Sequence, residues 1–290
     1  MHKLFFENLN PGTLLFSRFI LHGCTYANDE GGIYVCADTA QGGRKIVLKI
    51  LSRRSVHSEE VTKRLFRELS FSQRVKHPNV QRGLEFFADD DFAAFSMEYV
   101  EGGSLAQQLE RQYPFSFYRL LKILRQLCAG LEAIHAVGIC HRDLKPENIL
   151  LSATDEVRIT DFGVSAFLSS DLQGDYDDSL SGSLNYLSPE YVLEGRYDAR
   201  SDIYSLGVLA YELIAGRLPF IGKNMIDTLS ARLRDEAPPL HALAVKTPRP
   251  LSYAIMRAMH REPNKRFASI LEFRDALDFV RLPNGLPCAL

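Results

Sequence analysis

The fold of this chain is decided by one stretch, Cys140-His141-Arg142-Asp143-Leu144-Lys145-Pro146-Glu147-Asn148-Ile149-Leu150-Leu151. A carboxylate, a cation and a carboxamide lie within the six residues from Asp143 to Asn148, between a helix-like run and an apolar one. Polar side chains at this density are costly to bury unless they find partners. We therefore interpret the stretch as a catalytic loop.

The side chains of this loop are those that phosphoryl transfer requires. That reaction needs a carboxylate to orient the attacking hydroxyl, a cation to balance developing charge, and oxygen ligands for magnesium. Asp143, Lys145 and Asn148 supply one group of each kind. A second metal ligand, Asp161, opens the triplet Asp161-Phe162-Gly163 after a strand-like run. The alternative, two polar turns in an unrelated fold, is disfavoured because the combined motif is specific.

At these residues the chain resembles the eukaryotic-type (Hanks-type) protein kinases, over roughly residues 16–280. The order H-R-D-L-K-P-E-N, with D-F-G eighteen residues after Asp143, is typical of that family. Lys145 is similar to the serine/threonine branch rather than the tyrosine branch. The resemblance implies an α+β, two-lobed protein kinase fold, in which a small β-rich lobe carries the αC helix and a large lobe is mostly helical. The expected parts are a small lobe at 1–97, a hinge at 98–103, a large lobe at 104–290 and an activation segment at 161–190.

The composition is that of a globular protein, with 46% hydrophobic and 24% charged residues. A net charge of −2 predicts no nucleic-acid partner. Five cysteines, an odd number without metal-type spacing, indicate reduced thiols and a cytoplasmic location. No apolar run approaches the roughly 18 residues that a membrane span needs. Many bacterial relatives carry a membrane span and a sensor domain after the kinase domain, whereas this chain stops first, either naturally or by truncation. We expect it to resemble the soluble bacterial members.

The resemblance implies a nucleotide site in the small lobe and hinge. Lys49, in the apolar strand 46–50, would hold the α- and β-phosphates of ATP, and Glu68 would orient it from the following helix. The alternative is that Lys49 and Glu68 are ordinary charged side chains exposed to solvent. The Glu98 carbonyl and the Val100 amide would bind the adenine edge.

The glycine-rich phosphate loop departs from the family pattern. Gly31 opens a run similar to the usual exit strand, but Tyr26 and Asn28 occupy the places of the first two glycines. We expect Asn28 and Gly31 to border the nucleotide, and the acidic pair Asp29 and Glu30 to weaken its binding. A plain surface hairpin is the alternative.

Two small residues fall where active relatives stack large apolar side chains. Counting places Ser72 and Gly83 at these positions. Both are too small to fill the space against Phe162 of the D-F-G triplet. Unless Phe71 or Leu84 substitutes through a small register shift, the unfilled volume would hold the αC helix loosely. We therefore expect an inactive resting state that requires phosphorylation, a regulatory partner or self-association.

The activation segment carries the candidate regulatory sites Ser179, Ser181 and Ser183. Ser179 lies where relatives carry the activating phosphate, and Arg142 is the cation that would receive it. The alternative is an acidic loop without a regulatory phosphate. Residues 182–186 resemble the substrate-docking G-T-x-x-Y motif.

Three further residues fit the family as structural elements. Asp202 is expected to brace the catalytic-loop backbone, and Glu190 and Arg266 are expected to form a buried pair.

Taken together, the resemblance implies γ-phosphoryl transfer from ATP, with Mg²⁺ or alternatively Mn²⁺, to serine or threonine hydroxyls of protein substrates. It also implies autophosphorylation. Two other functions stay open, a nucleotide-binding pseudokinase scaffold and a small-molecule kinase.

Overall fold

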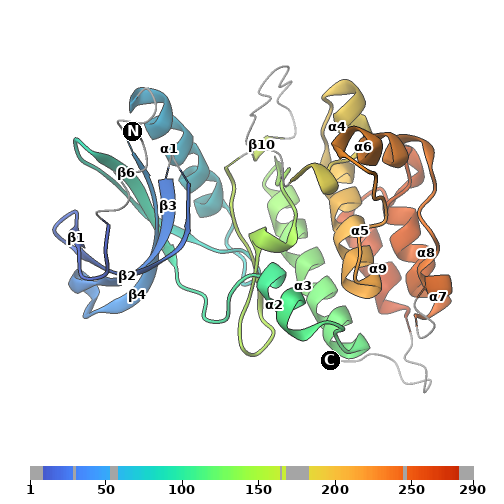
Figure 1. Ribbon diagram of the computed structural model, residues 1–290, viewed down its shortest axis with the longest axis horizontal. Coiled ribbons are helices and arrows are strands. Elements are labelled where there is room, and N and C mark those ends of the chain that lie inside the picture. The colour runs from blue at the N-terminus through green and yellow to red at the C-terminus, as the bar shows by residue number, and fades with distance from the viewer. Residues whose placement is uncertain are drawn as a thin grey trace. The chain divides into compact units, whose positions relative to one another are not determined.

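The chain divides into two compact units, which are described separately below (Figure 1). Unit 1 comprises Met1–Lys76 and Val80–Glu101, and unit 2 comprises His77–Asn79 and Gly102–Leu290. The structure is a computed structural model, and it describes residues 9–28, 31–52, 58–163, 165–167, 183–243 and 247–280.

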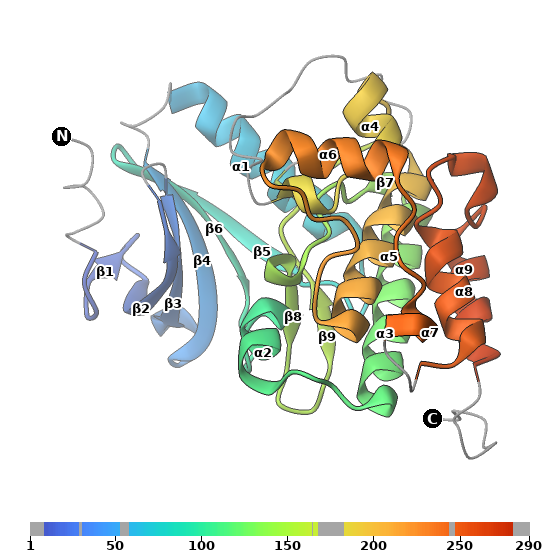
Figure 2. The same cartoon turned by 45° about the vertical axis from the view of Figure 1, so that its right-hand side comes forward.

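Unit 1 is a curved antiparallel sheet with one helix (Figure 2). Its strands pair in the order β1-β2-β3-β4-β6-β5. The helix α1 (Ser58–Arg74) follows β4 in the chain. The strands are β1 (Leu14–Leu15), β2 (Phe19–Ala27), β3 (Gly31–Asp38), β4 (Arg44–Ser52), β5 (Gly83–Ala88) and β6 (Phe92–Glu98).

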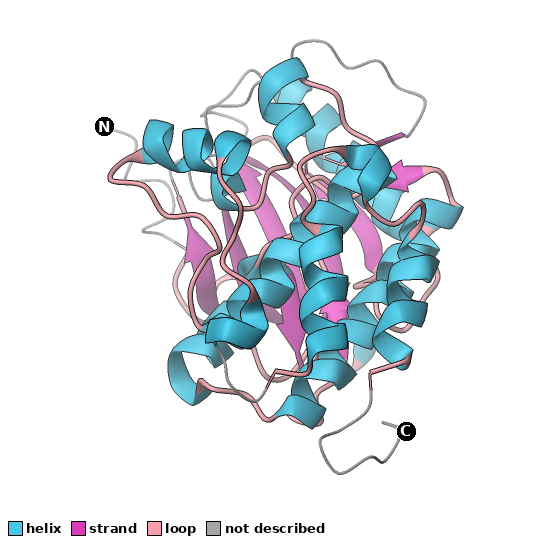
Figure 3. Ribbon diagram, turned by 90° about the vertical axis from the view of Figure 1, so that its right-hand side faces the viewer, coloured by secondary structure: helices cyan, strands magenta, loops and turns pink. Residues whose placement is uncertain are grey.

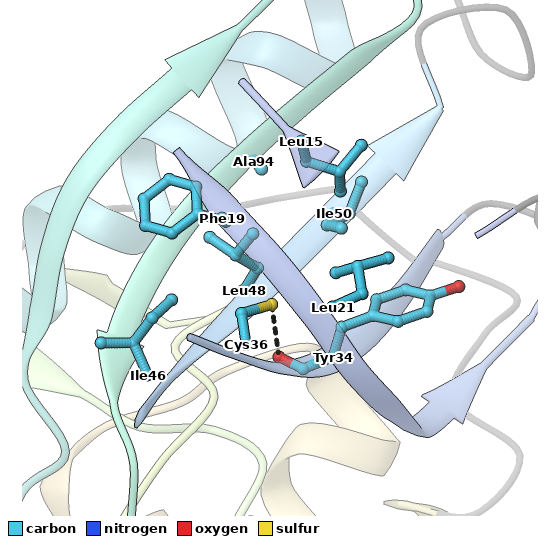
Figure 4. Close-up of a cluster of buried hydrophobic side chains, with 9 residues drawn as sticks. All are labelled: Leu15, Phe19, Leu21, Tyr34, Cys36, Ile46, Leu48, Ile50 and Ala94. Atoms are coloured by element: carbon cyan, nitrogen blue, oxygen red, sulfur yellow. Dashed lines mark hydrogen bonds between the residues drawn. The ribbon is translucent and has the colours of Figure 1, made fainter. Parts of the chain in front are cut away.

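Each face of this sheet carries a cluster of buried apolar side chains, and successive residues of a strand belong to opposite faces. On β4, Ile46, Leu48 and Ile50 point into one buried cluster, while Val47 belongs to a second cluster on the side of α1. Lys49 therefore shares the face of Val47 and points toward the helix. Figure 4 shows the first cluster, formed by Leu15, Phe19, Leu21, Tyr34, Cys36, Ile46, Leu48, Ile50 and Ala94.

The contact between α1 and β5 involves the two small residues singled out in the sequence, Ser72 and Gly83. A Cβ added to Gly83 would lie 2.3 Å from the Ser72 hydroxyl oxygen and 2.6 Å from a Leu69 methyl group. Ser72 is buried, and its hydroxyl donates to the Leu69 carbonyl at 2.8 Å. Within unit 1 the two small residues therefore leave no gap between them, because they let α1 approach β5 closely. The expected lack of stacking on Phe162, which belongs to unit 2, stays a prediction.

Unit 2 is mostly helical (Figure 3). Its central helix is α5 (Ala199–Ala215), which is buried along most of its length and packs against α3, α7, α8 and α9. The other helices are α2 (Leu105–Gln112), α3 (Phe117–Ala136), α4 (Pro189–Glu194), α6 (Met225–Arg234), α7 (Leu240–Leu243), α8 (Arg249–Ala258) and α9 (Ile270–Asp278).

Short strands and 3₁₀ turns in unit 2 carry the polar loop residues. The turns are η2 (Pro146–Asn148), η4 (Ser183–Asn185) and η5 (Pro263–Lys265), and the strands are β7 (Ile139–Cys140), β8 (Ile149–Leu151), β9 (Val157–Ile159) and β10 (Ala166–Phe167). The pairs are β8 with β9 and β7 with β10. A β-rich part followed by a helical part confirms the predicted α+β class. Within the described ranges, none of the helices combines the length and apolarity needed to span a membrane.

Candidate active site

Lys49 and Glu68 form the expected ion pair within unit 1. The Lys49 ammonium lies 2.7 Å and 2.8 Å from the two carboxylate oxygens of Glu68. Glu68 is only 3% exposed, on the face of α1 that packs against the sheet. The pair joins β4 to α1, which together with the close contact at Gly83 contradicts the expectation of a loosely held helix.

The predicted phosphate loop is a tight β2–β3 hairpin. The Asn28 amide donates to the Gly31 carbonyl, and the Gly31 amide donates to the Asn28 side-chain oxygen, each at 2.9 Å. Gly31 has no room for a side chain, since a Cβ there would lie 2.3 Å from the Ile50 carbonyl oxygen. Packing alone thus requires this glycine, and its nucleotide role stays a prediction. Asp29 and Glu30 lie outside the described residues.

The predicted adenine-binding residues lie at the end of the sheet. Glu98 ends β6, and its carbonyl oxygen accepts a hydrogen bond from the Gln81 side chain at 2.7 Å. A carbonyl oxygen has two lone pairs, so this bond leaves capacity for a second donor. Val100 follows two residues after the strand. Their role with a nucleotide remains a prediction.

The three predicted catalytic side chains meet in the loop between β7 and β8. Asn148 donates from its amide nitrogen to the Asp143 Oδ2 at 2.7 Å and to the Asp143 carbonyl at 2.8 Å. The Lys145 ammonium lies 2.9 Å from the same Oδ2. The other carboxylate oxygen, Oδ1, is buried and has no hydrogen-bond partner among the described residues. One oxygen of Asp143 is therefore held, while the other lacks a donor within the described part of the chain.

The β8–β9 hairpin brings Asn148 and Asp161 to the same end of the ladder. Ile149 pairs with Ile159, and the Thr160 amide donates to the Asn148 carbonyl at 3.0 Å. Asp161 has a left-handed backbone, φ 67°, and its Oδ1 accepts from the Gly163 amide at 3.2 Å. Because the amide nitrogen of Asn148 is occupied by Asp143, its oxygen is the atom left for a metal. An amide and a carboxylate oxygen suit Mg²⁺, which takes its other ligands from phosphates and water.

Asp202, at the start of α5, holds the backbone of the catalytic loop, as predicted. Its carboxylate accepts from the main-chain amides of His141 at 2.9 Å and Arg142 at 3.0 Å. It also bonds to the hydroxyl of Tyr197 and to a ring nitrogen of His135, both at 2.8 Å. Burial alone would raise the pKa of Asp202, but the hydrogen bonds from His135 and the loop hold it below its ordinary value. The confirmed contact fixes Arg142 in a left-handed conformation, φ 71°.

Sequence reasoning did not find two of these partners. His135 lies in the last turn of α3, and Tyr197 lies in the loop before α5. Neither belongs to a motif, and only the folded positions of α3 and of the loop before α5 bring them to Asp202. Burial raises the pKa of Tyr197 well above its ordinary value, and the negative charge of Asp202 adds to the effect. Its hydroxyl therefore stays protonated and donates to the carboxylate.

The end of the activation segment is anchored by the predicted pair of Glu190 and Arg266. The guanidinium binds both carboxylate oxygens, at 2.8 Å and 2.6 Å, and the Ser201 hydroxyl adds a third bond at 2.6 Å. Burial opposes ionisation of Glu190, but the Arg266 cation outweighs it and lowers the pKa of the carboxyl. This pair is confirmed.

The three candidate phosphosites lie largely outside the described part of the chain. Ser179 and Ser181 lie outside the described residues, and Ser183 begins η4, though its side chain is outside the description. The guanidinium carbon of Arg142, the predicted phosphate receiver, lies 5.5 Å from the centre of the Tyr197 ring. The Nε atom of Arg142 is buried without a partner among the described residues. Regulation at these serines stays a prediction.

Comparisons with known proteins agree with this geometry. The protein kinase domain family matches residues 29–274. The serine/threonine-protein kinase pkn2 of Myxococcus xanthus is 37% identical over 243 residues, which are 81% of this chain and 29% of that protein. PrkC of Bacillus subtilis is 32% identical over 82% of this chain and 37% of its own length. PknL of Mycobacterium tuberculosis is 30% identical over 94% of this chain and 68% of its own length. The chain thus spans about a third of the first two relatives.

Proposed function

The chain belongs to the family of protein kinase domains, and from this premise we propose that it transfers the γ-phosphate of ATP to serine or threonine hydroxyls of protein substrates. The observation that carries the proposal is the hydrogen bonding of Asp143. Its Oδ2 is held by Asn148 and Lys145, while its Oδ1 is buried without a donor among the described residues. A buried carboxylate oxygen without a donor is unfavourable. A substrate hydroxyl would supply the missing donor.

The chemistry of the loop follows from this arrangement. Asp143 orients the acceptor hydroxyl through Oδ1 and takes up its proton as the oxygen attacks phosphorus. Lys145, next to Oδ2, stabilises the negative charge that develops on the transferred group. Asn148 holds the Asp143 carboxylate in one orientation, so that little rearrangement is needed at the moment of reaction.

Two parts of the chain would hold the nucleotide and its metal. Asn148 and Asp161 offer oxygen ligands to Mg²⁺, with Mn²⁺ as an alternative, and the metal when bound neutralises phosphate charge. In unit 1, Lys49 is oriented by Glu68 and would bind the α- and β-phosphates. Asn28, Gly31, Glu98 and Val100 complete the proposed ATP-binding set.

The test is intact mass before and after incubation with Mg-ATP, for the wild type and for Asp143→Asn. We expect the wild type to gain phosphate and the variant to gain none, because Asp143 acts mainly in the transition state. ATP affinity, measured with a fluorescent analogue, should be nearly equal in the two proteins. Equal phosphate gain by both would contradict the role of Asp143. Peptide mapping of the added phosphate tests autophosphorylation at Ser179, Ser181 and Ser183.

A second candidate is a nucleotide-binding pseudokinase scaffold. It is favoured by the hairpin in which Asn28, not a glycine, binds the Gly31 amide. ATP binding without phosphate transfer to the protein itself or to a generic acceptor such as casein would support this candidate. A cytoplasmic location and a regulatory partner or self-association remain proposals from the sequence.

A further inference from the structure

The main-chain carbonyl of Glu98, the proposed acceptor for adenine, lies at the end of a strand. Glu98 is the last residue of β6, and β6 pairs with the edge strand β5 (Figure 2). The Glu98 amide donates to the Arg82 carbonyl at 3.2 Å. In a regular antiparallel pair, the returning bond to the Glu98 carbonyl would come from a main-chain amide. The Glu98 carbonyl accepts instead from a side chain, the amide nitrogen of Gln81, at 2.7 Å.

The Gln81 side chain is buried, and only 4% of the residue is exposed. A buried amide side chain is unfavourable unless it forms hydrogen bonds, whereas an apolar side chain of similar length needs no such partner. Val80, the preceding residue, is buried and apolar. Packing beside the edge strand therefore does not by itself explain a glutamine at position 81. The bond to Glu98 gives the amide a specific role at the end of the sheet.

This bond determines which direction of the Glu98 carbonyl oxygen is left for a ligand. A carbonyl oxygen has two lone pairs, and Gln81 binds at one of them. Because Glu98 ends β6, the side-chain bond takes the place of a ladder bond in holding the plane of this peptide group. The second lone pair is thereby aimed in one direction. Adenine carries an amino donor at position 6, whereas guanine carries an oxygen acceptor there, so only adenine brings a donor to this lone pair.

We propose that Gln81 is a positioning residue for base recognition, which orients the Glu98 carbonyl toward the 6-amino group of adenine and so favours 6-aminopurine nucleotides. The inference rests on the proposed ATP site in unit 1. A site that accepts a hydrogen bond from its ligand discriminates against an analogue without that donor, because the acceptor is then left unpaired. Loss of Gln81 should therefore weaken the binding of ATP more than that of a nucleotide without the amino group.

The test compares two nucleotides that differ only at position 6 of the purine. ATP carries the amino group, and purine riboside triphosphate carries a hydrogen there. Each nucleotide displaces a ribose-labelled fluorescent ATP analogue from the full chain, which gives a Kd without requiring phosphate transfer. Because the ribose and the phosphates are identical, the ratio of the two Kd values reports on recognition of the base alone.

Three variants distinguish the possible roles of the side chain. Gln81→Met keeps its length and removes the donor. Gln81→Glu keeps an acceptor oxygen, but when ionised it has no hydrogen to donate to the Glu98 carbonyl. Gln73→Met is the matched control, because Gln73 also donates to a main-chain carbonyl of unit 1, that of Leu84, at 2.6 Å. The Leu84 carbonyl has no proposed role in nucleotide binding.

The wild type should bind ATP roughly tenfold more tightly than purine riboside triphosphate. Gln81→Met should raise the Kd for ATP about fivefold, as expected for one neutral hydrogen bond, and change the other Kd by less than about twofold. Gln81→Glu should lose at least as much ATP affinity, since its carboxylate would face the carbonyl oxygen. Gln73→Met should keep both wild-type values. Melting temperatures verify that each variant is folded.

The outcomes separate failure of the inference from failure of the proposed function. A wild type that binds neither nucleotide overturns the ATP site and the inference with it. When the wild type binds ATP, the phosphate-transfer assay decides the function and the Kd ratio decides the inference. Equal binding of both nucleotides by the wild type, or an unchanged ratio in Gln81→Met, overturns the inference.

Gln81→Glu provides an independent decision. A wild-type ratio in this variant also overturns the inference, because the side chain would then act as an acceptor toward the base itself and not as a donor to Glu98. If Gln81→Met does not fold, Gln81→Glu decides in its place.

Discussion

Replacing Asp202 by asparagine should damage both the stability and the activity of the chain. Asp202 is fully buried and binds two main-chain amides, one hydroxyl and one imidazole. Each carboxylate oxygen serves one amide: Oδ1 binds Arg142 and Oδ2 binds His141. An asparagine has only one oxygen, so its NH₂ group would face one of these amides, donor against donor.

The size of the effect follows from the lost bonds. A hydrogen bond to a charged group contributes about 1.5–3 kcal/mol, and an opposed buried amide adds the penalty of an unsatisfied donor. We expect Asp202→Asn to lower the free energy of unfolding by about 3 kcal/mol. Arg142 is held at φ 71°, a conformation that is unfavourable by roughly 1–2 kcal/mol for a residue with a side chain. Loss of its amide bond would let Arg142 relax and displace the adjoining Asp143, lowering kcat roughly a hundredfold.

Urea denaturation followed by circular dichroism measures the stability change, because the chain has no tryptophan to serve as a fluorescence probe. The matched control is Asp198→Asn, on the exposed N-cap of the same helix, where the side chain accepts from the Arg200 amide at 2.7 Å. Asparagine caps a helix about as well as aspartate, so this control should stay within about 0.5 kcal/mol of the wild type. The reasoning is refuted if Asp202→Asn matches this control in both unfolding energy and kcat.

Further predictions concern packing and charge. Arg266→Met should lower the unfolding free energy by about 3–5 kcal/mol in urea titrations, because it leaves the mostly buried Glu190 without its cation; a loss below about 1 kcal/mol would contradict this. The folded pKa of Glu190 lies below its ordinary value, so its contribution is complete above about pH 4.5 and is lost as the pH falls through the folded pKa. The urea midpoint of Glu190→Gln should therefore decline less below that pH than the wild-type midpoint does. Gly31→Ala should lower the unfolding free energy by about 1–3 kcal/mol, since its Cβ would lie 2.3 Å from a carbonyl oxygen. In the same urea titrations, Gly23→Ala should be nearly neutral, because an added Cβ there has no atom within 4 Å.

Sequence reasoning reached furthest where chemistry lies in consecutive residues. The assignment to the protein kinases was made from Asp143 to Asn148 and Asp161 to Gly163, and the family match confirms it. It also found pairs far apart in the chain, such as Glu190 with Arg266, because the resemblance supplied their spacing. Periodicity alone would not have paired them, since nothing local to either residue points to the other.

Contacts that depend on how closely two elements approach were not predictable. The sequence predicted unfilled volume at Ser72 and Gly83, because both are smaller than the apolar side chains that active relatives carry there. The fold instead brings α1 against β5 until the Ser72 hydroxyl fills the space of a Gly83 side chain. Sequence reasoning missed Arg232 of α6 for a similar reason. Its guanidinium donates to the carbonyl groups of Leu184, Asn185 and Leu187. Its partners are main-chain carbonyls, which every sequence supplies, so no residue type marks the contact.

The choice between an enzyme and a scaffold depends on what each polar group does for the fold. Gly31 is required by the nearby Ile50 carbonyl, so its presence says nothing about phosphate binding. Glu68 is different, because a carboxylate that is 3% exposed is unfavourable there and its partner is Lys49. Two apolar residues would join the strand and the helix at least as well. Asp143 is likewise unfavourable for the stability of the fold, because its buried Oδ1 lacks a donor among the described residues. Groups that stability alone does not favour are best explained by a ligand, and the pair at Lys49 and the loop at Asp143 together favour the kinase.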